Sequence, residues 1–338
     1  MKKVVLFGGS FDPIHYGHLK MIQSAIKQTK ADEGWFILAD QAPLKDNKQA
    51  PYETRLSFIQ KMIKPFKKLK VTTIEKDMPK PNYTFDTIKQ LQRLYPGITF
   101  VLLIGTDQAV QFNQWKDEQE LLQLVEVVVY PRTLDPIDDV FTKLSGETFE
   151  VSSTQIRQGL SQETHPAILN EIIIHGVYGE EMLREFLHES RVQHSIEVAK
   201  LMAEFARHYH LDTQFYYGLG LIHDLMKQKE KDHELESLLS EEDKKNPPYT
   251  WHAIACHHYL SRVYKIKNRT FTNAIYHHVS GQSTSVAGML LYIADKCERT
   301  RKYDTEGFIE LTKRDLVKGF KAVKKEAKLY RDNKGANE

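Results

Sequence analysis

Residues 4–19 read VVLFGGSFDPIHYGHL, and this stretch is the most informative part of the 338-residue chain. Val4–Phe7 is a short apolar run typical of a buried strand, and it ends at once in two glycines. A loop that contains Pro13 follows, and a helical pattern begins near His15. Glycines let backbone N–H groups approach a phosphate, and a helix N-terminus favours an anion. The stretch therefore predicts a phosphate-binding strand–loop–helix unit.

The same alternation continues through the first half of the chain. Further apolar runs of strand length lie at Trp35–Leu38, Val71–Ile74, Phe100–Ile104 and Val125–Tyr130. Helical patterns lie between them, around His18–Gln28, Glu53–Ile63, Phe85–Leu94 and Glu118–Leu124. Alternating strands and helices predict a doubly wound, Rossmann-like α/β sheet of parallel strands, with ligands at the carboxyl ends of the strands.

The second half has a different character. After about Gly179, helical periodicity dominates, and we expect no strand there. Helices are predicted near Glu180–Glu189, Val192–His208, Thr213–Met226, Thr250–Leu260, Asn273–His277, Val286–Arg299 and Phe308–Tyr330. The sequence therefore predicts an α/β domain over residues 1–180 and an all-α domain over residues 181–338.

Composition narrows the class of protein. Hydrophobic residues make up 41% of the chain and charged residues 27%, and the formal net charge is +2, so no partner nucleic acid or membrane is expected. The two cysteines, Cys256 and Cys297, are too few for a disulfide framework and fit a reducing compartment. Neither a signal peptide nor a membrane-spanning segment is predicted, so the expected location is the cytoplasm.

Two motifs carry the chemistry of the first half. His15 and His18 stand three residues apart at a helix start, so both can face one anion. Val151–Arg157 reads VSSTQIR: a serine or threonine there can cap a late helix, and Arg157 can give forked hydrogen bonds to phosphate.

These motifs resemble the H-x-G-H and I-S-S-T-x-I-R elements of the nucleotidyltransferase superfamily. The resemblance implies adenylyl transfer with ATP and Mg²⁺, in which His18 contacts the α-phosphate and His15, Arg157 and Lys45 hold the triphosphate. Lys45 is equally well interpreted as a solvent-exposed loop lysine. The implied ATP-binding residues are Gly8, Gly9, Ser10, Phe11, His15, His18, Gly105, Asp107, Ser153, Thr154 and Arg157.

Within that superfamily, residues 1–178 look closest to nicotinate mononucleotide adenylyltransferase. Residues 81–87, PNYTFDT, resemble its S-Y-T-x-D-T segment, and residues 105–107 resemble its G-[AT]-D element. The resemblance implies that Tyr83 and Thr84 receive the nicotinate carboxylate and that Trp115 stacks on the pyridine ring; a core or rim tryptophan is the alternative. Leu44 replaces a common histidine and Asn82 a common serine, so nicotinamide mononucleotide stays open as the acceptor, with phosphopantetheine as a further alternative.

Metal-capable side chains recur on the predicted helices of the second half. His223 and Asp224 interrupt an apolar helical pattern, and a buried His-Asp pair is costly unless a partner such as a divalent metal satisfies it. Further candidate ligands lie on separate helices or helix ends, as expected of a helical bundle that gathers ligands at one interior site. The full candidate set is His194, His223, Asp224, His252, His278 and Asp295.

This order resembles the HD-domain metal phosphohydrolases and, over residues 186–330, their YqeK-like family. The resemblance implies a dinuclear site in which Asp224 bridges two divalent metals, with Fe favoured and Mn, Co or Zn possible. Such metals would activate a hydroxide and hold a phosphate. The implied reaction is the symmetrical splitting of diadenosine tetraphosphate into two ADP. Lys227 and Arg301 are candidates for binding the substrate phosphates or for charge balance near the metals, and are equally well interpreted as surface salt-bridge partners. Another nucleotide substrate, guanosine tetraphosphate among them, or a regulatory nucleotide sensor are the alternatives.

Overall fold

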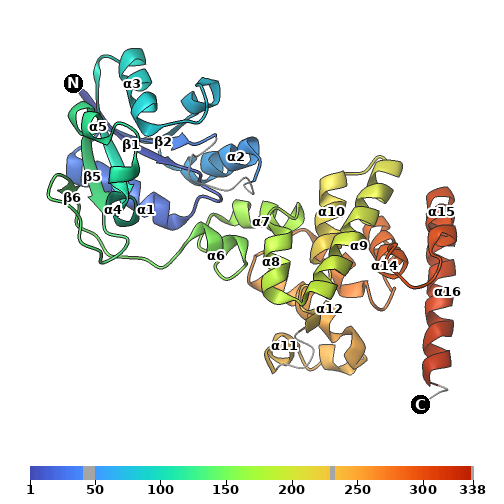
Figure 1. Ribbon diagram of the computed structural model, residues 1–338. Coiled ribbons are helices and arrows are strands. Elements are labelled where there is room, and N and C mark those ends of the chain that lie inside the picture. Colours follow the sequence, from blue (N-terminus) through green and yellow to red (C-terminus); the bar gives the residue numbers. More distant parts are fainter. Residues whose placement is uncertain (41–49, 229–232, 336–338) are drawn as a thin grey trace. The chain divides into compact units, whose positions relative to one another are not determined.

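The computed structural model describes residues 1–40, 50–228 and 233–335. Its contacts divide the chain into two compact units. The first unit comprises Met1–Ile156 with Glu163–His165, and the second comprises Arg157–Gln162 with Pro166–Glu338. Figure 1 shows that the first unit contains the sheet and that the second is helical.

The first unit is built on a six-stranded sheet with the order β3-β2-β1-β4-β5-β6. Every strand pair in it is parallel, so all carboxyl ends lie at one edge. The strands are β1 (Lys2–Gly9), β2 (Glu33–Leu38), β3 (Leu69–Thr72), β4 (Ile98–Gly105), β5 (Glu126–Tyr130) and β6 (Thr142–Lys143). The prediction of a doubly wound parallel sheet is confirmed, and the two-residue strand β6 is an addition to it.

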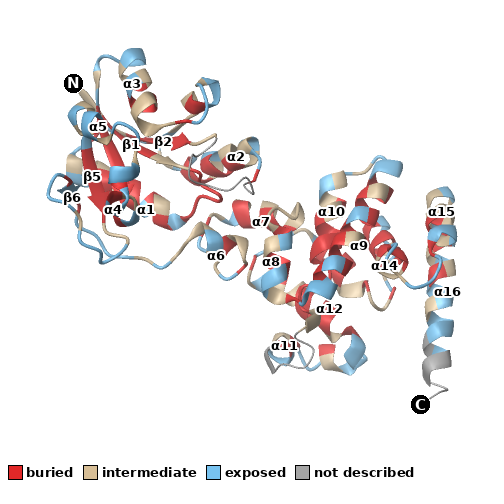
Figure 2. Cartoon of the chain, viewed as in Figure 1, coloured by how far each residue is buried: buried red, intermediate tan, exposed pale blue. Residues whose placement is uncertain are grey.

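β1 is central because it pairs with β2 on one side and with β4 on the other. Val4, Val5, Leu6 and Phe7 are all buried, as expected of a strand covered on both faces, and Figure 2 shows the strands mainly in the colour of buried residues. The chain order reverses between β1 and β4, so the carboxyl ends of these two strands form the switch point at which such sheets bind ligands.

Helices follow the strands as the alternating pattern predicts. The helices of this unit are α1 (Tyr16–Thr29), α2 (Tyr52–Ile63), α3 (Thr84–Leu94), α4 (Thr106–Val110) and α5 (Glu118–Leu124). α6 (Ser153–Arg157) reaches the unit division. Apolar residues at helical spacing place Ile88 and Leu91 of α3 and Leu121 of α5 in one buried cluster with Val4 and Leu6 of β1. This packing holds the loops at the carboxyl edge in place.

The second unit consists of helices and short connections. Its main helices are α7 (Pro166–Ile174), α8 (Gly179–Phe186), α9 (Glu189–His208), α10 (Thr213–Ile222), α11 (His233–Leu238), α12 (Trp251–Arg262), α13 (Arg269–His277), α14 (Val286–Cys297), α15 (Glu306–Arg314) and α16 (Leu316–Gly335). α9 and α10 pack closely at Gly220, where an added Cβ would lie 2.7 Å from Ala199 Cα. The prediction of an all-helical second domain is confirmed.

Several boundaries differ from the predicted ones. α10 ends at Ile222 rather than Met226, because His223 leaves the helical ladder and its Nδ1 hydrogen-bonds to the Gly220 carbonyl. The helix predicted over Phe308–Tyr330 is two helices, since Asp315 is extended between them. The units divide near residues 157–166 rather than at 180, because the buried face of α7 packs against α10.

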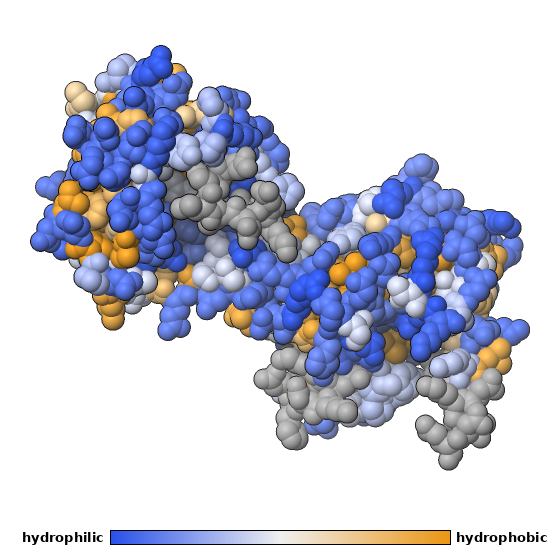
Figure 3. Space-filling view, in the orientation of Figure 1, coloured by the Kyte–Doolittle hydropathy of each residue, from blue (hydrophilic) through white to orange (hydrophobic). Residues whose placement is uncertain are grey.

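The visible surface is mainly hydrophilic, with small separate apolar patches on both units (Figure 3). Among the described residues, every helix is too short or too polar to span a lipid bilayer.

Candidate active sites

The end of β1 and the loop that follows it, residues 8–15, form an open surface that we call the cradle. The ideal Cβ position at Gly8 has no neighbour within 4 Å, so a ligand can approach this backbone closely. At Gly17, by contrast, a Cβ would lie 2.3 Å from Phe149 Cε2. The glycine between the two predicted catalytic histidines is thus a packing requirement.

His15 and His18 lie against each other at the start of α1. Their ring centroids are 3.7 Å apart, and the backbone N–H of His15 donates to His18 Nδ1 at 3.2 Å. Burial and the nearby Arg132 guanidinium lower the pKa of His15 to about 3, so this imidazole is neutral at physiological pH. His15 Nδ1 is buried and has no hydrogen-bond partner, which leaves it available to a ligand. Phe11 packs on the His18 ring at 5.1 Å.

Arg55 of α2 holds the loop after β1 in place, and its role was not predicted. Its side chain is buried and donates to the carbonyls of Ser10 at 2.9 Å, Ala39 at 2.8 Å and Ala50 at 3.0 Å. A buried guanidinium must be satisfied by such acceptors. Arg55 therefore fixes the loop after β1 relative to the end of β2.

The ends of β4 and β5 supply the neighbouring wall. The Thr106 hydroxyl donates to the Tyr130 carbonyl at 3.2 Å and accepts from the Arg132 backbone N–H at 3.1 Å. Asp107 pairs with Arg132 at 3.2 Å, and an added Cβ at Gly105 would lie 2.5 Å from the Asp107 carboxylate. Arg132 was not predicted; its position directly after β5, at the carboxyl edge, is the signal that points to it.

The predicted acceptor residues lie at the start of α3 and after α4. Tyr83 precedes α3 and Thr84 begins it. Lys116 joins the two segments, since its ammonium lies 4.9 Å from the Tyr83 ring centroid and 2.8 Å from Asp86. Trp115 packs on Phe112, with ring centroids 5.1 Å apart, and borders the buried cluster while keeping part of its surface exposed.

Glu75 and Asn82 hold this acceptor segment. The buried Glu75 carboxylate accepts from the Thr87 hydroxyl at 2.9 Å, and the Asn82 amide donates to the Glu75 carbonyl at 3.1 Å. Burial raises the pKa of Glu75 to about 7, with a smaller contribution from Asp40. Neither residue was predicted to have this role.

The motif Val151–Arg157 crosses the division between the two units. Ser152 caps α6 by accepting from the Gln155 N–H at 3.2 Å, and Ser153 donates to the Pro13 carbonyl at 2.9 Å, which ties α6 to the cradle loop. Thr154 is exposed. Arg157 belongs to the second unit, where its Nε donates to Glu181 at 2.8 Å. Lys45 lies outside the described residues.

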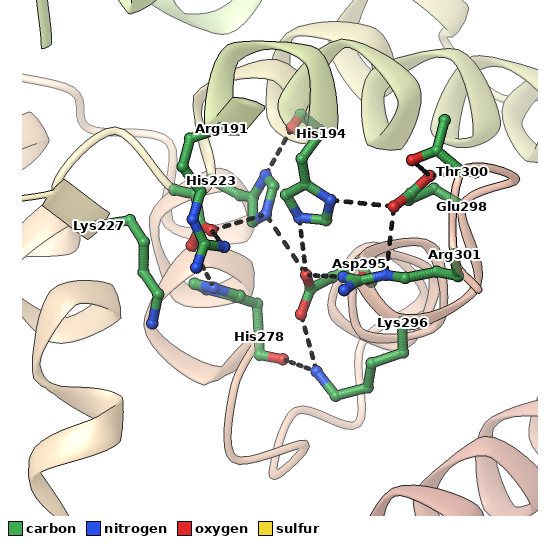
Figure 4. A network of polar contacts seen from close by, with 12 residues as sticks. Arg191, His194, His223, Lys227, His278, Asp295, Lys296, Glu298, Thr300 and Arg301 are labelled. Atoms are coloured by element: carbon green, nitrogen blue, oxygen red, sulfur yellow. Dashed lines mark hydrogen bonds and ion pairs between the residues drawn. The ribbon is translucent and has the colours of Figure 1, made fainter. Parts of the chain in front are cut away.

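In the second unit, the structure brings the six predicted metal ligands together: five form two overlapping groups, and Asp295 Oδ1 lies 3.2 Å from His194 Nε2 and 3.8 Å from His223 Nε2. Figure 4 labels His194, His223, His278 and Asp295 among them. His194 comes from α9, His252 from α12 and Asp295 from α14, while His223 and Asp224 follow α10 and His278 follows α13. The His194, His223 and Asp224 ligand atoms lie within 4.8 Å of one another, and so do those of Asp224, His252 and His278. Asp224 is common to both groups.

The imidazoles are oriented for ligation. The Nδ1–H groups of His223 and His278 face the carbonyls of Gly220 and Ile275, each at 2.7 Å, which leaves the Nε2 atoms directed inward. His223 Nε2 is buried and without a hydrogen-bond partner, which is the condition a metal would relieve. His278 Nε2 lies 3.2 Å from Asp224 Oδ1, and His252 Nε2 lies 3.3 Å from the same oxygen. Imidazole nitrogens and carboxylates together suit a divalent transition metal.

The carboxylates are held in the charged form that a metal requires. Burial opposes their ionisation, yet the imidazoles around Asp224 keep the pKa of that carboxyl well below its usual range. Lys296 and His194 do the same for the pKa of Asp295.

Cationic side chains surround the group (Figure 4). The predicted Lys227 places its ammonium 3.3 Å from His252 Nδ1, and the predicted Arg301 contacts Asp295 Oδ1 at 3.5 Å. Arg191 and Lys296 were not predicted; they lie 3.9 Å from Asp224 Oδ2 and 2.8 Å from Asp295 Oδ2. Their positions in the sequence could have predicted them as neighbours of the ligand group, since Arg191 precedes His194 by one helical turn and Lys296 adjoins Asp295.

Comparison with known proteins gives a separate family match for each half of the chain. Residues 6–159 match the cytidylyltransferase-like family and residues 191–300 match the HD domain. The chain is 29% identical to "Probable nicotinate-nucleotide adenylyltransferase/Ap4A hydrolase" of Mycoplasma genitalium, over 97% of this chain and 96% of that protein. It is 27% identical to the protein of the same name in Mycoplasma pneumoniae, over 97% of this chain and 100% of that one.

A third relative covers the first half alone. "Probable nicotinate-nucleotide adenylyltransferase" of Methylacidiphilum infernorum is 34% identical over 48% of this chain and 81% of its own length. The chain therefore belongs, through its first half, to the nicotinate-nucleotide adenylyltransferase family, and it carries an HD domain in its second half.

Proposed function

We propose that the first unit transfers an adenylyl group from ATP to nicotinate mononucleotide, giving deamido-NAD and pyrophosphate. The observation that carries the proposal is the paired His15 and His18 beside the open Gly8 backbone, at the switch point of the sheet. The names of the relatives agree with this reaction. A phosphate oxygen of the acceptor attacks the α-phosphorus of ATP, the bond to the β-phosphate oxygen breaks, and pyrophosphate leaves.

The residues of the unit act by position and charge, which is how proteins catalyse phosphoryl-type transfers. His18, in the first turn of α1, contacts the α-phosphate, while the neutral His15 donates a hydrogen bond to a phosphate oxygen. Mg²⁺ supplies charge neutralisation between the phosphates. Arg132, at the carboxyl edge of the sheet, adds a cation that the sequence analysis lacked.

Acceptor choice belongs to Tyr83, Thr84 and Trp115. Backbone N–H groups at the start of α3 receive the nicotinate carboxylate, because the first turn of a helix leaves such donors unpaired. The partly exposed Trp115 stacks on the pyridine ring.

The test is a comparison of acceptors with the purified chain, ATP and Mg²⁺. Nicotinate mononucleotide should give the highest kcat/KM, and phosphopantetheine should give no product. Equal or faster turnover of nicotinamide mononucleotide would move the assignment to that acceptor.

The second unit is proposed to hydrolyse diadenosine tetraphosphate symmetrically to two ADP. The observation that supports it is the pair of ligand groups that share Asp224, with Arg191, Lys227, Lys296 and Arg301 around them. Four phosphates carry more negative charge than a mononucleotide, which matches this number of cations. The names of the two full-length relatives agree.

Two divalent metals, with Fe favoured and Mn, Co or Zn as alternatives, would be held by the His194, His223, Asp224 group and by the Asp224, His252, His278 group. When bound, they supply Lewis acidity and make water a better nucleophile. The protein orients the imidazoles and places the cations. Water adds to a phosphorus beside the central bridging oxygen, and the bond to that oxygen breaks.

Product analysis tests this reaction. Diadenosine tetraphosphate with Mn²⁺ or Fe²⁺ should yield ADP alone. AMP with ATP would indicate an asymmetrical cut, and binding without turnover under every metal would favour a regulatory nucleotide sensor. The expected compartment for both activities is the cytoplasm.

A further inference from the structure

Glu298 is a buried carboxylate next to the metal-ligand group, and neither proposed reaction has used it. It directly follows α14, three residues after Asp295, and only 2% of its surface is exposed. A buried carboxylate is costly unless its oxygens are well satisfied, so its partners indicate why it is there.

Each carboxylate oxygen of Glu298 has a defined partner set (Figure 4). Oε2 accepts from the Thr300 N–H at 2.7 Å and from the Thr300 hydroxyl at 2.6 Å. Oε1 lies 3.2 Å from His194 Nδ1 and 3.2 Å from Arg301 Nε. Thr300 and Arg301 therefore fix the carboxylate, and the fixed carboxylate faces one imidazole.

His194 needs such a partner because of where it stands. His223 and His278 each turn Nδ1 toward a carbonyl three residues earlier, at a helix end where that carbonyl is accessible. His194 lies within the 20-residue helix α9, where backbone carbonyls accept from the N–H groups of the next turn. A side chain from another element must then hold its Nδ1.

We propose that Glu298 is a positioning residue that accepts the Nδ1–H of His194 and so directs Nε2 toward the metal position shared with His223 and Asp224. The inference rests on the proposed metal-dependent function of this unit. Partners of this kind fix the tautomer and orientation of a ligating histidine, and their loss typically weakens metal binding about 10- to 100-fold.

The effect should be confined to one of the two metal positions. His194, His223 and Asp224 form one ligand group, while His252 and His278 join Asp224 in the other. The Nδ1 atom of His278 is held by the Ile275 carbonyl, which does not depend on Glu298. Loss of the Glu298 carboxylate therefore predicts one weakened position and one intact position.

The experiment is a Mn²⁺ titration of the full-length chain after chelation, with free Mn²⁺ counted by electron paramagnetic resonance. Wild type should bind two Mn²⁺ per chain. Glu298→Gln should retain one position and lose about 10- to 100-fold in affinity at the other. An amide has one acceptor oxygen and one NH₂ group, so it cannot accept from Thr300 and from His194 at the same time. Glu298→Asp keeps the charge and should recover part of the lost affinity.

Glu204→Gln is the matched control, because it neutralises another carboxylate of the same unit, paired with Arg299 at 2.7 Å and Lys313 at 2.9 Å. It should bind two Mn²⁺ as wild type does. Should Glu298→Gln fail to fold, Thr300→Val provides the test instead. This variant removes one hydrogen bond to the Glu298 carboxylate and should lower the Mn²⁺ affinity of the same position about fivefold.

The possible results distinguish a failure of the positioning role of Glu298 from a failure of the proposed hydrolase function. Two Mn²⁺ bound with wild-type affinity by Glu298→Gln, or by Thr300→Val where the first variant is unfolded, would overturn the positioning role alone. Thermal unfolding of the metal-free proteins distinguishes a merely structural role, which would lower the melting temperature and leave both affinities unchanged. A wild-type chain that binds no Mn²⁺ would overturn the proposed hydrolase together with this inference.

Discussion

At the scale of single residues, the proposed adenylyl-transfer site contains two histidines that have different environments. His15 is buried, with its pKa lowered to about 3, whereas His18 keeps part of its surface exposed beside the cradle loop. Their 3.7 Å ring contact couples the orientation of one to the other. The side chain closest to the reacting phosphate should therefore be His18, with His15 as a neutral donor behind it.

Replacement of His18 by Ala should lower kcat for adenylyl transfer about 10²- to 10³-fold, because one preorganised contact to the transition state is lost. Steady-state kinetics with ATP and nicotinate mononucleotide measure the effect. Tyr16→Phe is the control, since the Tyr16 side chain is exposed and its backbone N–H, which bonds to the Glu163 carbonyl, is kept. A kcat for His18→Ala within fivefold of wild type would contradict the assigned role.

Glu75 makes the stability of the first unit depend on pH. Burial raises its pKa from 4.5 to about 7, so the folded state favours the protonated acid and loses stability as the pH rises from about 4.5 to 7. Glu75→Gln stays neutral, so its stability relative to wild type should increase by on the order of 2 kcal/mol between pH 5 and pH 8. Urea unfolding at the two pH values measures the difference.

Glu53→Gln provides the comparison for that experiment, because Glu53 is an exposed carboxylate in a surface pair with Lys76. Its relative stability should change little over the same pH range. A Glu75→Gln variant that follows the wild-type pH profile would show that Glu75 is already ionised in the fold.

What the sequence did and did not reveal is clearest for charged residues. His15, His18 and the six metal-capable side chains stand in motifs, so residue type and spacing were sufficient to select them. Arg55 and Arg132 have no local pattern of that kind, and Glu298 stands in the stretch Ala294–Arg301 without a spacing that assigns it a role. Their roles arise from partners distant in sequence, such as the Ser10 carbonyl for Arg55 and His194 for Glu298, and only the folded chain brings these together.

At the scale of elements, the close packing of α9 on α10 positions three of the candidate metal ligands, His194, His223 and Asp224. Gly220 permits it, because an added Cβ would lie 2.7 Å from Ala199 Cα. Gly220→Ala should destabilise the second unit by about 1–3 kcal/mol through overpacking. Chemical denaturation followed by circular dichroism measures this change.

Gly307→Ala is the matched helical control, since its added methyl group meets no atom within 4 Å in α15. It should stabilise the chain by up to about 1 kcal/mol, because alanine favours the helix. Equal effects of the two substitutions would contradict close packing at Gly220.

Elements whose apolar residues follow a clear pattern were predicted well. Helix ends that coincide with a side-chain hydrogen bond were not. Five strands were found because each is a short apolar run, and the fifth helix of the first unit was predicted with its observed bounds, Glu118–Leu124. The end of α10 at Ile222 was missed because apolar periodicity continues through Leu225 and Met226. His223 Nδ1 donates to the Gly220 carbonyl at this end, a side-chain contact that apolar periodicity does not predict.

At the scale of the whole molecule, two sets of reactive residues lie in two separately packed units. An adenylyltransferase joins nucleotides through phosphates, and a hydrolase in the same chain would remove dinucleotide by-products. Arg55 under the cradle loop and Glu298 beside His194 each make their supporting contacts inside their own unit, and of the predicted ATP-site residues that the structure describes Arg157 belongs to the second unit. Each activity should therefore survive loss of the other.

The central claim, one chain with two independent nucleotide activities, is tested most directly by a single variant assayed for both. Asp224→Ala removes the carboxylate common to both ligand groups and touches no residue of the first unit's site. Chromatography of reactions with diadenosine tetraphosphate and Mn²⁺, and with ATP, nicotinate mononucleotide and Mg²⁺, follows both products. We predict that wild type forms ADP and deamido-NAD, and that the variant forms deamido-NAD at the wild-type rate but no ADP. Undiminished ADP formation by Asp224→Ala, or intact diadenosine tetraphosphate with the wild-type chain, would contradict the account.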